Sequence, residues 1–182
     1  FTGARWEKFE PRRPYWRLQG EDGVKTIYAK FRDADGNISE TVTATIELDR
    51  TPPSDPSLII NGGKQFTNDR SKTVLLELSA VDADKMRVSN RVDFLGAPWV
   101  AFRTEVKAWR LDHTEGKQTI YAQFMDKAGN VSEVTSSEIT LDLQPPRNCS
   151  VKINDDSPLI KSNKVVLTIK SEGASEMIIR GG

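Results

Sequence analysis

The chain has 182 residues, enough for one or two ordinary domains, and its 26 basic and 26 acidic residues give a formal net charge of zero. Because these charges are interspersed, no basic stripe favours a nucleic-acid partner. No apolar run approaches the roughly 20 residues that a membrane helix needs. Hydrophobic residues make up 37% of the chain, and its glycines bring the apolar content close to that of ordinary folded proteins.

One stretch near the N-terminus occurs a second time in almost the same letters. Residues 28–40 read YAKFRDADGNISE, and residues 121–133 read YAQFMDKAGNVSE. The offset between them, 121 − 28 = 93 positions, also relates Trp6 to Trp99. A self-similar spacing of this size indicates an internal repeat that is as long as a domain.

The repeat continues into the last part of the chain. Ile60 aligns with Ile153 at the same offset of 93, whereas Val74 aligns with Val165 at an offset of 91. The turn-rich stretch between these positions is therefore two residues shorter in the last copy, and loops tolerate such changes. The chain contains the end of one repeat, a whole second repeat and the start of a third, and we expect it to be a fragment of a longer protein.

The whole repeat is predicted to consist of β-strands. Short runs in which apolar and polar residues alternate, bounded by Gly, Pro, Asn and Asp, are typical of antiparallel strands with one buried face. We expect seven strands, which favour a two-sheet sandwich, near 57–60, 72–79, 85–89, 98–102, 106–111, 117–125 and 133–142. Trp109 and Tyr121 are expected in the core, and Trp99 and Phe102 are expected to be half buried.

The repeated stretch is interpreted as the last hairpin of each sandwich. The letters DKAGN lie between the strand that ends near Phe124 and the one that begins near Val131, and DADGN occupies the same place in the first copy. Glycine supplies a positive φ in such turns, and Asp and Asn close them with their side chains. Paired prolines follow each last strand, and their fixed φ predicts short, stiff joints.

The motifs INGG, VLLELSA, GKQTIYAQFMDKAGNVS and ITLDLQPP follow one another in the middle repeat. This combination resembles the tandem immunoglobulin-like and fibronectin type III-like repeats of bacterial and archaeal secreted or cell-surface proteins. The resemblance covers nearly the whole chain, although INDD replaces INGG in the last copy. It implies an all-β fold of tandem seven-stranded immunoglobulin-like β-sandwiches, one complete and two partial, and an extracellular or cell-surface location.

Five segments are therefore expected. They are the C-terminal part of a first repeat (1–50), a Pro-rich linker (51–56), a complete repeat (57–143), a second Pro-rich linker (144–149) and the N-terminal part of a third repeat (150–182).

Two weak calcium sites are considered. Asp33, Asp35 and Asn37 have the spacing that begins an EF-hand loop, but the sixth position is Ile38 rather than Gly, and the second copy has Ala128 in place of Asp35. A plain hairpin turn is the favoured interpretation.

The second calcium hypothesis places an ion at a joint between repeats. It would use Asp49 or Asp142 together with loop carboxylates such as Asp82 and Asp84. Apart from calcium, the sequence implies no cofactor.

Enzyme chemistry has little support in the sequence. The one histidine, His113, lies in a polar segment, and the motifs of serine hydrolases, phosphate loops and C-x-x-C sites do not occur. The adjacent carboxylates Glu21 and Asp22 are expected in a solvated turn. The single cysteine, Cys149, is expected to be a free thiol, with a disulfide to a partner as the less favoured reading.

The exposed aromatic residues leave a binding function open. Trp6 and Trp99 are the best candidates for stacking on a sugar, although recurrence at matched positions favours packing for the tryptophans. The expected function is a structural, non-enzymatic segment (stalk, spacer or assembly module) whose partners are the rest of a longer chain or other copies of the repeat. An adhesive or carbohydrate-binding module is the alternative.

Head-to-tail assembly by strand complementation is a further alternative. The first partial repeat is expected to supply about four strands and the third about three, and together these would complete one sandwich.

Overall fold

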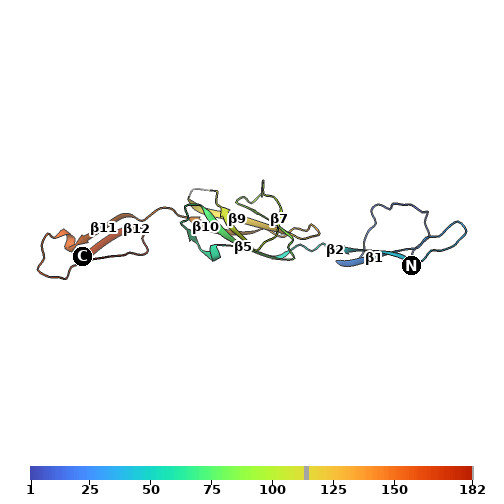
Figure 1. Ribbon diagram of the computed structural model, residues 1–182, viewed down its shortest axis with the longest axis horizontal. Coiled ribbons are helices and arrows are strands. Elements are labelled where there is room, and N and C mark those ends of the chain that lie inside the picture. The colour runs from blue at the N-terminus through green and yellow to red at the C-terminus, as the bar shows by residue number, and fades with distance from the viewer. Residues whose placement is uncertain (113–114, 182) are drawn as a thin grey trace.

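The computed structural model describes residues 1–112 and 115–181. Figure 1 shows an elongated molecule made of three β-segments in series, with the N- and C-terminal segments at opposite ends and a larger segment between them. Apart from strands, the described residues form only two short 3-10 turns, Asn61–Gly63 and Asn154–Asp156. The prediction of an all-β fold is confirmed.

The middle segment consists of two packed sheets. One sheet has the strand order β3-β5-β8, and the other has the order β4-β10-β9-β6-β7. The strands are β3 (Ser54–Ile60), β4 (Phe66–Thr67), β5 (Thr73–Val81), β6 (Lys85–Ser89), β7 (Val100–Ala101), β8 (Glu105–Arg110), β9 (Gly116–Met125) and β10 (Thr135–Leu141). A strand occurs at each of the seven expected places, and the short β4 is an eighth that the sequence did not indicate.

The core lies between the two sheets. Every second side chain is buried from Val74 to Leu78 in β5 and from Gln118 to Phe124 in β9, as the alternation predicts. One cluster of buried apolar residues draws on both sheets: Leu58, Ile60, Val74, Leu76, Leu78, Met86, Leu111, Ile120, Ala122, Phe124, Ile139 and Leu141. The ring of Phe102 meets that of Phe124 edge-on, with centroids 5.8 Å apart.

Trp109 and Tyr121, the two aromatic residues expected in the core, are both only half buried. Trp109 is half buried and packs against the core cluster, with its indole N–H donating to Asn90 Oδ1 at 2.7 Å. Tyr121 was expected in the core, and this was wrong. Its neighbours Ile120 and Ala122 are buried, so Tyr121 lies on the opposite face of β9 and is only half buried. Trp99 and Phe102 are half buried, as expected.

The N-terminal segment is a single hairpin of β1 (Gly23–Ala29) and β2 (Val42–Leu48). Gly23 pairs with Leu48, and in the middle segment Gly116 pairs with Leu141. Both members of the second pair lie 93 positions later, since 116 − 23 = 93 and 141 − 48 = 93, and the whole seven-pair register is shifted by the same amount.

The C-terminal segment pairs β11 (Arg147–Ile153) with β12 (Leu167–Glu172). Ile153 lies opposite Leu167, as Ile60 lies opposite Leu76 in the β3-β5 pair. Each segment therefore has the local pairing that its sequence alignment predicts.

The end segments have fewer strands than expected. The structure places two strands in each, rather than about four in the first and about three in the last. Residues 1–22 align with a stretch that contains β7 and β8, but these strands pair with β6 and β5, which residues 1–50 do not provide. A strand forms only where a neighbour satisfies its backbone groups, so residues 1–22 contain no strand.

Candidate functional site

The predicted calcium loop is a closed hairpin turn. Asp33 Oδ1 accepts the backbone N–H of Asn37 at 2.8 Å, and Asp33 Oδ2 accepts the side-chain N–H of the same residue at 2.8 Å. Asp126 and Asn130 make the same two bonds at 2.9 and 2.8 Å. Gly36 has a φ of 93°, so the turn needs its glycine.

The same hydrogen bonds change the pKa of the Asp33 carboxyl. The side-chain hydrogen bond from Asn37, followed by that from its backbone N–H, lowers the pKa of Asp33 below its ordinary value. Both oxygens of the carboxylate are thus already used by the turn. The calcium hypothesis for Asp33, Asp35 and Asn37 stays a prediction.

The joint carboxylates also have local partners. Asp49 Oδ1 accepts the backbone N–H of Thr51 at 3.0 Å, and Asp142 Oδ1 accepts that of Gln144 at 3.0 Å. Within residues 1–112 and 115–181, no group of three or more His, Cys, Asp or Glu side chains is placed to hold a metal ion. The hypothesis of calcium at a joint therefore rests on the sequence alone.

The two tryptophans proposed for ligand binding each have a guanidinium over the ring. Arg32 lies 4.6 Å from the ring centroid of Trp6, and Arg87 lies 4.7 Å from that of Trp99. Arg87 also lies 4.4 Å from the ring of Phe94, which is buried. Such cation–π contacts occupy one face of each indole.

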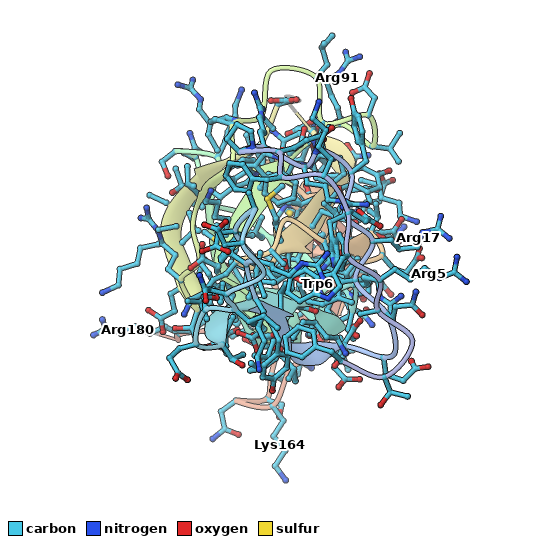
Figure 2. All side chains as sticks on the ribbon, turned by 90° about the vertical axis from the view of Figure 1, so that its right-hand side faces the viewer. Arg5, Trp6, Arg17, Arg91, Lys164 and Arg180 are labelled. Atoms are coloured by element: carbon cyan, nitrogen blue, oxygen red, sulfur yellow. The ribbon has the colours of Figure 1, made fainter. Side chains whose placement is uncertain are left out.

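The two tryptophan rings differ in how far they are exposed to solvent. The side chain of Trp6 is 48% exposed, and Figure 2 shows it near the middle of the N-terminal end, whereas Arg5 and Arg17 point outward at the right-hand edge of the view. Trp99 is half buried and belongs to the middle segment. The structure does not bring the two indoles together, since Trp6 lies in the N-terminal segment at one end of the molecule (Figure 1).

His113 and Cys149 are two further residues that the sequence analysis singled out. His113 lies outside the described residues. Cys149 is a free, exposed thiol in β11, with its Sγ 3.3 Å from Ser171 Oγ.

A carboxylate clamp holds the joint that follows each last strand, and sequence reasoning missed it. Asp22 accepts the backbone N–H of Arg50 at 2.9 Å and the hydroxyl of Thr51 at 2.8 Å. The Nε–H of Arg50 donates to the other oxygen at 2.7 Å. These bonds, led by that from the backbone N–H of Arg50, lower the pKa of Asp22 to about 2.

The second joint has the same clamp with different side chains. Glu115 accepts the backbone N–H of Leu143 at 3.2 Å and the side-chain N–H of Gln144 at 2.8 Å. Glu115, Leu143 and Gln144 are the residues at the offset of 93 from the first clamp. The signal in the sequence was an acidic residue directly before the glycine that begins the strand, in both copies.

The first joint also accepts a hydrogen bond from the middle segment. The side-chain N–H of Asn130, in the turn between β9 and β10, donates to the backbone carbonyl of Asp49 at 3.2 Å. The hairpin turn of the middle segment therefore contacts the chain that leaves the N-terminal segment.

No described helix is long and apolar enough to span a bilayer.

No protein-family model matches the chain, and no curated protein matches it either.

Proposed function

We propose that this chain is a non-enzymatic structural segment, a stalk or spacer built from tandem immunoglobulin-like sandwiches of a secreted or cell-surface prokaryotic protein. The class of sandwich and the location rest on the resemblance of the repeated motifs. The mechanical role rests on one observation, which is that both joints of the middle segment carry the same carboxylate clamp.

The clamp explains how a joint stays stiff. Asp22 and Glu115 precede the first residue of β1 and β9, and each binds the residues that follow the partner strand of its hairpin. Each joint then enters a Pro-Pro pair, whose φ angles are fixed. The first clamp fixes the chain where it leaves the N-terminal segment, and the second fixes it where it leaves the middle segment. Fixed exits that lead into stiff joints would keep successive segments at a set separation, which is the task of a spacer.

Pulsed electron–electron spin resonance tests this role. Labels would be placed on the native Cys149 and on a Ser54→Cys variant, because these positions lie next to the two joints and the Ser54 hydroxyl bonds its neighbour Asp55. The ten-residue β9 and the extended second joint together predict one narrow distance of about 50 Å. A broad distribution would contradict a stiff spacer. Labelled chains would be diluted with unlabelled ones, and chains labelled at Cys149 alone would serve as the control.

A carbohydrate-binding module is the second candidate, and the exposed face of Trp6 is the observation that favours it. If this function holds, Trp6→Ala should abolish glycan binding and leave the melting of the middle segment unchanged. Trp99→Ala should instead lower the unfolding free energy by about 2 kcal/mol, since a half-buried indole and its cation–π contact are lost. Glycan binding that survives Trp6→Ala would exclude Trp6 as the binding residue, and a wild-type chain that binds no glycan would exclude this candidate.

A further inference from the structure

A polar hollow opens beside β5 and β8 in the middle segment (Figure 1). Its volume is about 450 Å³, which lies within the range of sites that bind small molecules. The hollow is lined mainly by polar side chains, and the residues that carry the argument are Asn61, Lys64, Thr67, Thr73, Leu75 and Lys107.

The hollow lies on the outer face of the β3-β5-β8 sheet. Leu75 is half buried, whereas its neighbours Val74 and Leu76 are buried in the core, so Leu75 belongs to the outer face. Residues 61–72, which connect β3 to β5, supply further lining residues, and Lys107 comes from β8. The site therefore combines an apolar side chain of the sheet with polar groups from a loop and a second strand.

A β-bulge interrupts β8 at the hollow. Val74 lies opposite Trp109, and two positions later Leu76 lies opposite Val106. The step is 76 − 74 = 2 residues in β5 but 109 − 106 = 3 residues in β8, so β8 contains one extra residue between Val106 and Trp109. A bulge re-aims a side chain away from the regular alternation. Lys107 lies in this stretch and lines the hollow.

The lining carries more positive than negative charge. Lys64 and Lys107 make no ion pair with the described residues. Asp69 also lines the hollow, but its Oδ1 accepts the backbone N–H of Ser71 at 2.8 Å and its Oδ2 accepts the hydroxyl of Thr73 at 3.2 Å. Two ammonium groups beside one locally bonded carboxylate favour an anionic ligand.

Neutral donors accompany the two lysines. Asn61 Oδ1 accepts the backbone N–H of Leu75 at 2.8 Å, which fixes the amide group, and the Asn61 amide nitrogen makes no hydrogen bond to the described residues. The Thr67 hydroxyl accepts the backbone N–H of Asp69 at 3.4 Å, so its own proton is available to donate. These groups can bind uncharged hydroxyl oxygens.

The fold does not require the lysine at position 64. Lys64 N–H donates to Asn61 O at 3.4 Å, and in the last copy Ser157 N–H donates to Asn154 O at 3.2 Å. Asn154 Oδ1 accepts the backbone N–H of Val166 at 2.8 Å, as Asn61 Oδ1 accepts that of the equivalent Leu75. Because the same turn forms with serine in place of Lys64, the lysine is free to serve a ligand.

We propose that this hollow binds an acidic saccharide, specifically a hexuronate unit. The ammonium groups of Lys64 and Lys107 bind the carboxylate through charge-assisted hydrogen bonds. Asn61 and Thr67 bind ring hydroxyls, and Leu75 contacts the apolar face of the ring. A small inorganic anion would use the lysines alone, whereas a hexuronate uses all three kinds of group. This inference goes beyond the spacer function and does not depend on it.

An NMR titration of the isotope-labelled full chain tests the site. Methyl glucuronide is the probe, methyl glucoside is the neutral control with the same ring, and inorganic phosphate is the anion control, all at constant ionic strength. Methyl glucuronide should shift the amide signals of Asn61 and Leu75 until they saturate. Both controls should bind at least about tenfold more weakly, because each lacks one set of contacts.

Three lysine variants locate the site. Lys64→Gln and Lys107→Gln should each weaken methyl glucuronide binding about tenfold, since each removes a charged hydrogen-bond donor. Lys85→Gln removes an exposed lysine from β6 in the other sheet and should bind as the wild type does. All three side chains are exposed, so the melting temperature of the middle segment should stay unchanged.

Several results would overturn the proposal. Wild-type Asn61 and Leu75 amides that do not shift at tens of millimolar methyl glucuronide would do so, as would Lys64→Gln and Lys107→Gln variants that bind as the wild type does. Equal binding of methyl glucoside would show that the charge plays no part. Equal binding of phosphate would show a site for small anions and not for a saccharide. None of these results changes the spin-label distance that tests the spacer.

Discussion

Asn130 donates its side-chain N–H to the backbone carbonyl of Asp49 at 3.2 Å, across 81 positions of sequence. The same side chain closes the turn between β9 and β10 by donating to Asp126 at 2.8 Å. One residue therefore stabilises a hairpin and holds the preceding joint. Asn37 closes the equivalent turn in the N-terminal segment and offers a matched comparison.

Asn130→Ala should loosen the first joint. The loss of about one net hydrogen bond should lower the unfolding free energy of the middle segment by about 1 kcal/mol. The order parameter of the Thr51 amide, measured by NMR relaxation, should also fall. Asn37→Ala should change neither quantity, and a Thr51 amide that responds equally to both variants would contradict the joint contact.

Asp22 should make the first joint sensitive to acid. Its pKa in the folded chain is about 2, below the ordinary value of 3.8, so the clamp is favourable above pH 3.8. That contribution is lost as pH falls through about 2. An NMR titration of the Asp22 carboxyl should show a midpoint near pH 2, accompanied by a shift of the Arg50 amide. A midpoint near 3.8 would mean that the clamp does not form.

Phe124 and Phe31 occupy equivalent positions with opposite burial. Phe124→Ala should lower the unfolding free energy of the middle segment by about 3–5 kcal/mol, as expected for a fully buried aromatic ring. Phe31→Ala should change it by less than about 0.5 kcal/mol, because the Phe31 side chain is exposed in the N-terminal segment. Chemical denaturation monitored by tryptophan fluorescence would measure both, and similar losses for the two variants would show that the segments are not independent.

Calcium offers a direct comparison between the two copies of the hairpin. The plain-turn interpretation predicts no change in melting temperature when calcium is added to millimolar concentration, because the Asp33 oxygens are already bonded to Asn37. An increase in melting temperature that Asp35→Ala abolishes would instead establish a weak site in the first copy.

Period-two alternation explains why the strands were predictable. The buried Leu76 and Leu78 and the turn at Asp126 follow from local patterns that a single sequence displays. The prediction for Tyr121 was wrong because adjacent residues of a strand point to opposite faces of the sheet. Which of the two faces is buried depends on how the sheets pack, and here it is the face of Ile120 and Ala122.

Features that depend on distant partners were not predictable. The clamp at Asp22 joins residues 28 positions apart, and the acidic residue before the glycine does not by itself show which distant residues it binds. The strand count in the end segments was wrong for a related reason. Residues 1–22 carry a strand-like pattern, but strand formation depends on a paired neighbour as well as on composition.

Small-angle X-ray scattering of the full chain, extrapolated to zero concentration, tests the central claim most directly. A compact domain of this length would have a radius of gyration of about 16 Å. A chain of modules in series should give a value well above that, and a distance distribution with a long tail. A radius of gyration of about 16 Å would contradict the spacer.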